Sequence, residues 1–265
     1  MTRLAIVGAG VMGEALATGL LESGWRPDDI VLADLVPERV EDLGKRLGAR
    51  ATTSTREAAS SADGTLLAIK PQEAAKALSD VSGAVGASGV VSIVAGLRTA
   101  SIEHALGGGA SVVRAMPNSP ARVGKGVTAL AAGAHAADAT RDLAGAVFGA
   151  VGPVVWLSED ALDAVTALSG SGPAYVFLLA EAMVDAATAM GLARDVAETL
   201  TFETIEGAGR MLTQTGVDPA TLRSQVTSKG GTTEAAISVF EDAGLRKIVA
   251  EAMEAAHRRS KELGS

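Results

Sequence analysis

The sequence predicts an α/β domain followed by an all-α domain. In the first part of the chain, short apolar runs alternate with stretches of helical spacing, which is the pattern of a parallel sheet covered by helices. After Leu157 only helical patterns follow. A glycine-rich segment, Gly8–Gly13, joins the first apolar run to the first helical stretch. We therefore expect two domains, 1–157 and 158–265.

Composition indicates a globular protein and excludes several kinds of site. The 265 residues are 48% hydrophobic, enough for a large core. The net charge of -8 argues against a nucleic-acid partner, because no basic face is available to neutralise phosphates. The absence of cysteine excludes disulfides and thiolate metal ligands. The histidines, His104, His135 and His257, are too far apart in sequence to have the spacing of metal ligands, so no metal is expected.

The apolar runs of the first domain are short and bounded by turn residues, as buried strands are. The expected strands are Leu4–Val7, Ile30–Ala33, Thr65–Ile69, Val90–Val94, Val112–Arg114, Val127–Ala131 and Val154–Leu157. Helices are expected between them, at Glu14–Ser23, at Pro37–Leu47 and around 136–148.

The second domain is expected to contain helices separated by three breaks. The breaks lie at Ser169–Pro173, Gly216–Asp218 and Ser228–Gly231. Asp218 and Pro219 form a favourable N-cap and first-turn pair. The last helix has one apolar stripe, made of Leu245, Ile248, Val249, Ala252, Met253 and Ala256.

Apolar residues between Tyr175 and Leu192 cover much of the helix circumference. A small helical domain has few places to bury them, so we expect a homodimer, with burial inside a helical bundle as the alternative. The longest uncharged run, Ala164–Ala180, contains the Ser169–Pro173 break, which argues against a membrane span. The N-terminus lacks the hydrophobic region of a signal peptide. We expect a cytoplasmic protein with no membrane partner.

The Gly8-x-Gly10-x-x-Gly13 pattern lies between an expected strand and an expected helix, the context in which it marks a dinucleotide-binding site. The first glycine permits the turn, the second lets a pyrophosphate approach the backbone, and the third allows close packing of helix and strand. Val11 and Met12 complete this loop and are expected to contact the cofactor. The first domain is therefore expected to be of Rossmann type.

An acidic residue, Asp34, follows the second expected strand. A carboxylate there can accept hydrogen bonds from the adenine ribose 2'-hydroxyl and would repel a 2'-phosphate unless a cation compensates. Arg39 is the nearest candidate cation, at an uncertain reach. The cofactor is expected to be NADPH or NADH, with a slight preference for NADH. The alternative is that Asp34 only caps the helix that begins at Pro37.

A second glycine-rich helix start occurs in the segment Ser228–Thr233. Unpaired backbone N–H groups at the positive end of a helix suit a small anion such as a carboxylate. Three more segments lie at expected strand or helix ends and are rich in Pro, Gly, Ser or Asn: Ala68–Pro71, Met116–Pro120 and Ser169–Tyr175. The first two are placed at the carboxyl edge of the sheet, where doubly wound sheets bind ligands.

In order and spacing, these five segments resemble those of the pyrroline-5-carboxylate reductase family along essentially the whole chain. The resemblance implies reduction of the cyclic imine 1-pyrroline-5-carboxylate to L-proline, the last step of proline biosynthesis. It implies an all-α dimerisation domain that interlocks with a second subunit, so that the active site is shared. It also implies further assembly, commonly into rings of ten subunits.

The same resemblance implies roles for particular residues. The substrate carboxylate would be held by Ser228, Gly231, Thr232 and Thr233. The hydroxyl of Thr233 would lie near the ring nitrogen as the candidate catalytic group, with a helix N-cap as the alternative role. Substrate and nicotinamide would be surrounded by Ala68, Lys70, Pro71, Ala95, Met116, Pro117 and Asn118. Reduction of a protonated imine depends on positioning more than on a strong acid or base.

The chain departs from the family pattern at two glycine-rich segments and also at Leu35, where a basic residue often accompanies NADPH use. Val11 stands where Asn or Gln is common, and Lys229 stands where many members have Pro; the role of Lys229 is open. A β-hydroxyacid dehydrogenase shares the glycine motif but needs a lysine on the first long helix of its second domain, and no lysine occurs between Ser158 and Lys229. Other imine or ketimine reductases, and a non-catalytic nicotinamide-binding protein on the same fold, are the further alternatives.

Overall fold

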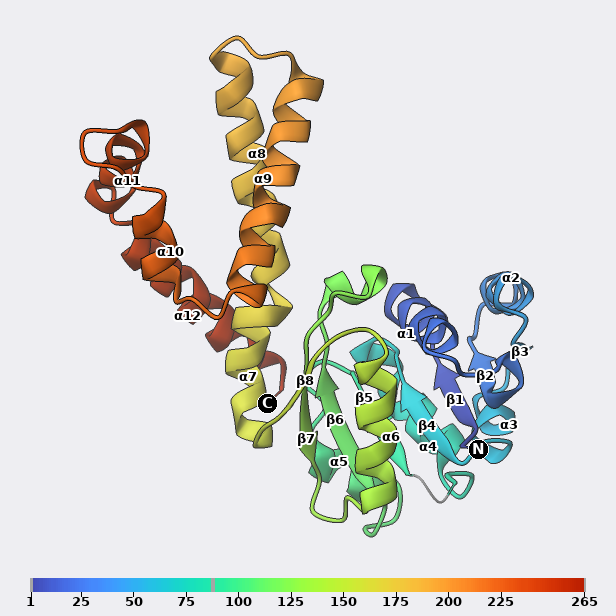
Figure 1. Cartoon of the computed structure of the whole chain (residues 1–265). Coiled ribbons are helices and arrows are strands. Elements are labelled where there is room, and N and C mark those ends of the chain that lie inside the picture. Colours follow the sequence, from blue (N-terminus) through green and yellow to red (C-terminus); the bar gives the residue numbers. More distant parts are fainter. Residues whose placement is uncertain (1, 87–88, 265) are drawn as a thin grey trace. The chain divides into compact units, whose positions relative to one another are not determined.

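The computed structural model describes residues 2–86 and 89–264. The chain forms two compact units (Figure 1). Unit 1 contains Met1–Ser171 together with the C-terminal Ala256–Ser265, and unit 2 contains Gly172–Ala255.

Unit 1 is built on an eight-stranded sheet with the strand order β3-β2-β1-β4-β5-β6-β7-β8. The strands are β1 (Leu4–Val7), β2 (Ile30–Ala33), β3 (Arg50–Thr52), β4 (Gly64–Leu67), β5 (Val90–Ser92), β6 (Val112–Met116), β7 (Thr128–Ala132) and β8 (Val154–Trp156). Neighbouring strands pair in parallel except β6 and β7, which are antiparallel. Strands β1, β2 and β4 are buried at every residue, which explains the continuous apolar runs of β1 and β2.

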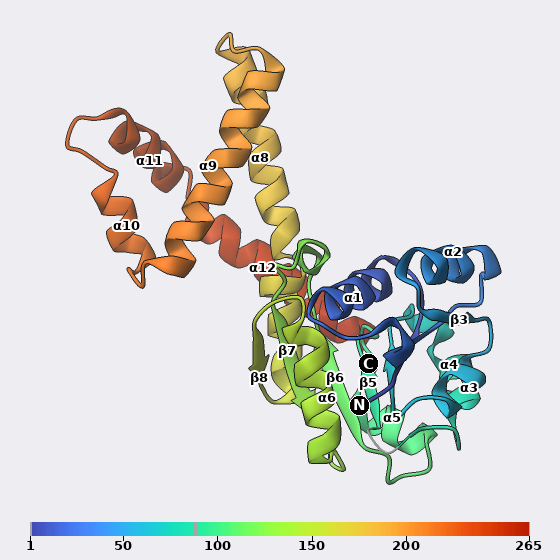
Figure 2. The same ribbon diagram turned by 45° about the vertical axis from the view of Figure 1, so that its right-hand side comes forward.

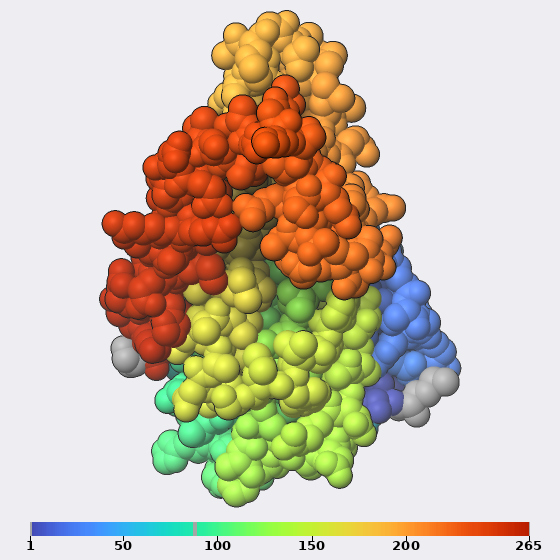
Figure 3. Space-filling model, turned by 60° about the vertical axis from the view of Figure 1, so that its left-hand side comes forward, coloured from blue at the N-terminus to red at the C-terminus, as the bar shows by residue number. Residues whose placement is uncertain are grey.

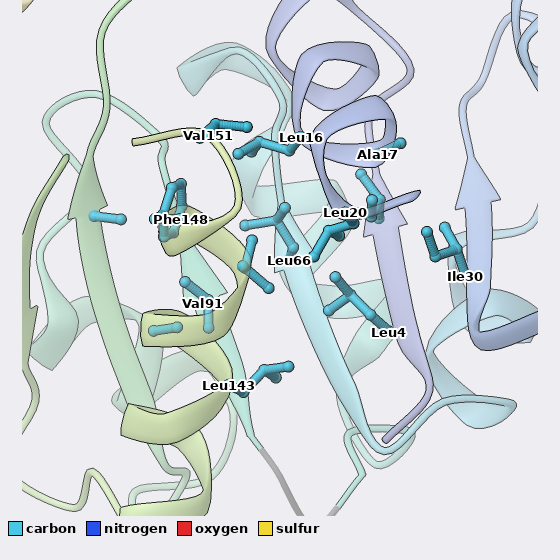
Figure 4. Close-up of a cluster of buried hydrophobic side chains, with 14 of the residues drawn as sticks. Leu4, Leu16, Ala17, Leu20, Ile30, Leu66, Val91, Leu143, Phe148 and Val151 are labelled. Carbon is cyan, nitrogen blue, oxygen red and sulfur yellow. The ribbon is translucent and has the colours of Figure 1, made fainter. Parts of the chain in front are cut away.

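Helices cover both faces of this sheet (Figure 2). One face carries α1 (Val11–Glu22), α2 (Pro37–Leu47) and α6 (Asp138–Gly149), and the other carries α3 (Thr55–Ser60), α4 (Ala74–Val81) and α5 (Thr99–Ala105). Figure 4 shows the first of these cores, where Leu16 and Leu20 of α1 and Phe148 of α6 lie around Leu66 of β4. The doubly wound fold expected from the alternating pattern is therefore confirmed.

Short helical segments connect the strands and complete unit 1. They are η1 (Pro27–Asp29), η2 (Pro71–Glu73), η3 (Ser119–Val123), η4 (Glu159–Ala161), α7 (Leu162–Val165) and the π-helix η5 (Thr166–Gly170). The expected break at Ser169–Pro173 is wrong, because the chain stays helical from η5 into α8. Pro173 cannot donate to the Ser169 carbonyl, and a wider turn, in which the Ser171 N–H bonds Thr166 O at 2.8 Å, accommodates it.

Unit 2 is entirely helical. Its elements are α8 (Gly172–Ala189), α9 (Arg194–Gln214), α10 (Pro219–Gln225), α11 (Thr232–Asp242) and the first part of α12 (Leu245–Leu263). The expected breaks at Gly216–Asp218 and Ser228–Gly231 are confirmed, and Asp218 caps α10 by accepting hydrogen bonds from the Ala220 and Thr221 N–H groups. A further break, at 190–193, separates α8 from α9.

The helices of unit 2 have almost no core of their own. Among the described residues, α8 and α9 bury only Ala180, Val184, Ala197 and Thr201, and α10, α11 and α12 bury none. In the space-filling view, the helices α9 to α11 are drawn in orange to red (Figure 3). By length and composition, the helix over Glu159–Ala189 is also apolar enough to cross a membrane. These exposed apolar side chains need a covering partner.

Candidate active site

A cleft of about 740 Å³ opens in unit 1 at the carboxyl ends of β1, β2 and β4. The expected cofactor residues that line it are Gly8, Gly10, Val11, Met12, Asp34, Ala68 and Lys70. It is also lined by residues that the sequence analysis did not assign, among them Thr55 and Ile93. The cleft lies where the strand order passes from β1 to β4, the place at which doubly wound sheets bind ligands.

The three glycines of the loop are required for three different reasons. Gly8 has φ +105°, and a Cβ there would overlap the backbone oxygen of Ala68. A Cβ on Gly13 would overlap the backbone oxygen of Gly8, so this residue permits close packing of α1 on the loop. Gly10 is different, because a Cβ there meets no atom within 4 Å. The space beside Gly10 is left to a ligand.

The start of α1 provides unpaired donors to this space. Gly10 is the N-cap and makes no side-chain cap hydrogen bond, and the first intrahelical bond runs from Glu14 N to Gly10 O at 2.9 Å. The N–H groups of Val11 and Met12 therefore have no acceptor inside the helix. Both residues line the cleft, and Val11 is 65% exposed. This arrangement suits the pyrophosphate of a dinucleotide.

Asp34 connects the glycine loop to the start of the next helix. Its Oδ2 accepts a hydrogen bond from the Ala9 N–H at 2.8 Å, and its Oδ1 accepts one from the Val36 N–H at 2.9 Å. The Arg39 guanidinium lies 3.3 Å from Oδ2 and lines the cleft, so it reaches the carboxylate of Asp34. The N-cap of α2 is Val36, which has no side-chain cap hydrogen bond, so Asp34 is not the cap of that helix.

Three expected cofactor residues lie outside the lining of the cleft. Gly13 is buried beneath the loop, Pro71 begins η2 at the surface, and Ala95 lies in an exposed turn after β5. The neighbour of Ala95, Gly96, has φ +73° and packs so closely on the backbone of Leu263 that a Cβ would overlap it. The C-terminal end of the chain therefore supports this turn.

The segment Met116–Asn118 follows β6 and is mostly buried. Met116 is half-buried, and Pro117 and Asn118 are buried. The Asn118 Oδ1 accepts a hydrogen bond from the Val127 N–H at 2.9 Å, and its Nδ2 donates to Ser169 O at 3.2 Å. Asn118 is expected to lie beside the substrate, and its side-chain amide is bonded to the protein through both its oxygen and its nitrogen.

A buried ion pair below this segment was missed by sequence reasoning. Arg114 of β6 lies 3.2 Å from Glu159, and the two side chains are 11% and 18% exposed. Glu159 also accepts hydrogen bonds from the N–H and hydroxyl of Thr99, at 2.8 and 2.9 Å. A charged residue inside an otherwise apolar strand requires such a partner, and this was the available signal.

In unit 2 the expected carboxylate site is the turn before α11. Gly230 has φ +73°, its N–H donates to Glu234 Oε2 at 2.6 Å, and the Gly231 N–H donates to Ser228 O at 3.0 Å. Gly231 is the N-cap and makes no side-chain cap hydrogen bond. The N–H groups of Thr232 and Thr233 therefore have no acceptor inside the helix.

The structure gives the position of Thr233 in its helix and the exposure of Lys229. Thr233 is the second residue of α11, so it is not the N-cap, and its side chain is half-buried. Lys229 is exposed. Unit 2 thus brings Ser228, Gly231, Thr232 and Thr233 together at one helix start, and unit 1 does the same for the glycine loop, Asp34, Ala68 and Lys70.

A doubly wound sheet, a glycine loop that opens a helix and an acid after the second strand define unit 1 as a dinucleotide-binding Rossmann-type domain. Residues 3–96 match the family model described as NADP oxidoreductase, coenzyme F420-dependent, and residues 159–263 match the model described as pyrroline-5-carboxylate reductase dimerisation. The chain is therefore an oxidoreductase of the NAD(P)-dependent class with a dimerisation domain.

Full-length relatives identify the family. The chain is 40% identical to pyrroline-5-carboxylate reductase of Synechocystis, with 99% of this chain and 98% of that protein covered. It is 40% identical to the enzyme of the same name from Mycobacterium tuberculosis, with 99% and 97% covered. The solved structure of such a reductase from Coxiella burnetii superimposes with a TM-score of 0.93 at 36% identity, covering 100% of this chain and 99% of that one.

The chain belongs to the pyrroline-5-carboxylate reductase family. The expected family and fold class are thereby confirmed. A related structure, from Plasmodium falciparum, is 28% identical with a TM-score of 0.89, covers 100% of this chain and 98% of that one, and was solved with NADP bound.

Proposed function

We propose that this chain reduces 1-pyrroline-5-carboxylate to L-proline, the last step of proline biosynthesis. The observation that carries the proposal is the presence, in one member of this family, of two glycine-rich helix starts without a side-chain cap, at Gly10 and at Gly231. Each offers backbone N–H groups to an anion. One suits a cofactor pyrophosphate and the other a substrate carboxylate.

The residues of the cleft fit a nicotinamide dinucleotide. The open space beside Gly10 and the free N–H groups of Val11 and Met12 suit the pyrophosphate, and Asp34 Oδ1, which accepts from the Val36 N–H, retains one lone pair for a ribose hydroxyl. Ala68, Lys70, Pro71 and Ala95 follow β4 and β5 and are assigned to the nicotinamide end. When bound, the reduced nicotinamide supplies the hydride for the imine carbon.

The proposed cofactor preference rests on Asp34 and Arg39. The Asp34 carboxylate favours a ribose with a free 2'-hydroxyl, so NADH is the proposed preferred cofactor. Arg39 lies 3.3 Å from Asp34 and is half-exposed, so its guanidinium can turn toward a 2'-phosphate. NADPH is therefore expected to be used as well, with a modest disadvantage.

The turn before α11 is the proposed carboxylate site. Ser228, Gly231, Thr232 and Thr233 would hold the substrate through backbone N–H groups and hydroxyls at the positive end of the helix. The Thr233 hydroxyl is the proposed hydrogen-bond partner of the ring nitrogen. A hydroxyl of this kind is too weak an acid to act alone, so orientation of the imine is its main contribution. Met116, Pro117 and Asn118 would face the substrate through their backbone.

The proposed assembly is a homodimer with a shared active site. The support is the nearly coreless helical unit, with exposures of 60% for Phe177, 66% for Leu178 and 54% for Phe202. Burial against a second subunit would also account for the apolar helix Glu159–Ala189, so no membrane is needed to cover it. The proposed protein is therefore soluble and cytoplasmic. A domain boundary after Leu157 is proposed because only helices follow that residue. A ring of ten subunits is proposed from the family resemblance alone.

The test is the oxidation of reduced nicotinamide by the purified protein. Turnover is expected with 1-pyrroline-5-carboxylate, with both NADH and NADPH, and not without an imine. Turnover of a six-membered cyclic imine or a 2-hydroxy acid, with none of 1-pyrroline-5-carboxylate, would overturn the assignment. Cofactor binding without turnover of any of these would indicate a non-catalytic nicotinamide-binding protein.

A further inference from the structure

One buried side chain fastens three segments of unit 1 together. Asn118 is 9% exposed and follows β6. Its Oδ1 accepts from the N–H of Val127, just before β7, and its Nδ2 donates to the carbonyl of Ser169 in the π-helix η5. The loop after β6 is thereby bonded to the start of the next strand and to the end of the helical segment that precedes unit 2.

These two partners require one acceptor and one donor from the side chain at position 118. The Val127 N–H needs an acceptor and the Ser169 carbonyl needs a donor, and the side-chain amide offers one of each. In an α-helix the Ser169 carbonyl would receive the N–H four residues later, but that residue is Pro173, which has none. Aspartate would present two acceptors and alanine would present neither group.

The same loop is supported from two further sides. A Cβ on Gly170 would lie 2.5 Å from the terminal methyl carbon of Met116, so η5 packs directly against this side chain. Arg114 pairs with Glu159 at the start of η4. The segment 159–170 is therefore tied to β6 near both of its ends, and Met116 lies between the two ties.

We propose that Asn118 is a positioning residue for hydride transfer. It sets the backbone of Met116 and Pro117 and does not bind the substrate through its own amide. The inference rests on the proposed reductase function, in which this loop faces the reacting atoms. Hydride transfer requires close alignment of donor and acceptor carbons, so a shift of the loop reduces kcat more than it changes substrate affinity.

The first test compares Asn118→Ala with Ser169→Ala. Asn118→Ala removes both hydrogen bonds and is expected to lower kcat by about 10- to 100-fold, with a change in the substrate KM of less than about threefold. Ser169→Ala retains the carbonyl that Asn118 uses and removes only a hydroxyl bonded to Val165 O, so kcat and KM should stay within about twofold of wild type.

The second test uses the pH dependence of Asn118→Asp. Burial and the facing carbonyl raise the pKa of the introduced carboxyl. Once protonated, it donates to Ser169 O while its second oxygen still accepts from the Val127 N–H. The variant's kcat and its ligand-free Tm, both relative to wild type, should therefore recover from about pH 8 to about pH 5. The deficit of Asn118→Ala should be independent of pH.

The outcomes separate this proposal from the proposed function. A raised KM with unchanged kcat and unchanged ligand-free Tm in Asn118→Ala would show direct substrate contact and overturn the proposal. A deficit of Asn118→Asp that does not depend on pH would also overturn it. Failure of the proposed function has another signature, the absence of 1-pyrroline-5-carboxylate turnover in the wild type, and the Tm comparison can be read even then.

Discussion

The two glycine-rich helix starts use the same backbone chemistry in opposite surroundings. The loop before α1 is enclosed: Gly8 and Gly13 pack so closely on neighbouring backbone that neither has room for a Cβ. The turn before α11 is open: Gly230 meets nothing within 4 Å, and Gly231 is approached only by Ser228. The first helix start is therefore enclosed by its own unit, whereas the second is open.

This difference teaches where each site obtains its rigidity. At α1 the buried sheet fixes the loop, and residues from β1, β2 and β4 surround the cleft. At α11 no residue of the helix is buried among the described residues, and the local hydrogen bond from the Gly230 N–H to Glu234 holds the turn. A carboxylate bound there needs further groups from outside the helix, as a shared active site would provide.

Gly13→Ala should have the largest effect, because the new methyl group would overlap the backbone oxygen of Gly8. Overpacking against backbone in a closed loop is expected to cost about 3 kcal/mol of unfolding free energy and to abolish cofactor binding. Denaturant unfolding and titration with NADH measure the two effects.

Gly10→Ala is the matched control for the enclosed loop, since its Cβ enters open space. Unfolding free energy should change by less than about 1 kcal/mol, while the cofactor Kd rises about tenfold because the methyl group occupies the pyrophosphate position. If Gly13→Ala and Gly10→Ala proved equally stable, the contrast between an enclosed and an open helix start would be wrong.

Thr233→Ala should lower kcat by at least about tenfold, or ~1.4 kcal/mol in activation free energy, without changing Tm. Tm should not change because Thr233 is the second residue of α11 and its side chain does not cap the helix. Steady-state kinetics and thermal unfolding measure the two quantities. Thr233→Ser retains the hydroxyl and should recover most of the activity. Unchanged kinetics in Thr233→Ala would remove this residue from the mechanism.

Arg39→Ala should reduce kcat/KM with NADPH about tenfold more than with NADH, because the guanidinium is the proposed partner of a 2'-phosphate, which NADH lacks, whereas the ion pair with Asp34 is lost with both cofactors. Arg46→Ala is the control on the same helix, since Arg46 pairs with Glu14 and Asp42 and does not line the cleft. It should leave the ratio of the two cofactors unchanged. A higher NADPH preference in Arg39→Ala would contradict the assigned role of the guanidinium.

Much of the enclosed site could be predicted from the sequence. The glycine spacing, the apolar runs and Asp34 all follow from local pattern, and the parallel strands β1, β2 and β4 bring their carboxyl ends to one edge of the sheet. The short strand β3 and helix α3 were missed, because Arg50–Thr52 is too brief and polar to form an apolar run. The antiparallel direction of β7 depends on the chain returning beside β6, which local pattern does not encode.

The partners that hold Asn118 and Arg114 were not predictable, because each lies far along the chain. Ser169 and Glu159 reach them through the packing of η4 and η5 on β6, and the π-helix contradicts the rule that a Ser-Gly-Ser-Gly-Pro run ends a helix. Tertiary packing outweighed local propensity at that place. The turn before α11 was easier to locate than to interpret, because its own helix does not enclose a ligand.

A third helix start, at α10, provides the smallest effect and a direct check on the comparison. Here a side chain does what Gly10 and Gly231 leave undone: Asp218 accepts hydrogen bonds from Ala220 N, Thr221 N and the Thr221 hydroxyl. These hydrogen bonds lower the pKa of Asp218 below its usual value, and the bond from the Thr221 hydroxyl has the largest effect. The Ala220 and Thr221 N–H groups at the start of α10 are therefore not available to a ligand.

The pH dependence of this cap has a defined sign. A carboxyl whose pKa is lowered by folding stabilises the folded state above its unfolded pKa of about 3.9, and the stabilisation is lost as pH falls through the lower folded pKa. Asp218→Ala should therefore lower Tm at pH 7, with the difference from wild type closing below about pH 4. Asp218→Asn caps without titrating, so its Tm should exceed that of Asp218→Ala at every pH. A difference between Asp218→Ala and wild type that persists at low pH would show that the charge of Asp218 does not stabilise this helix start.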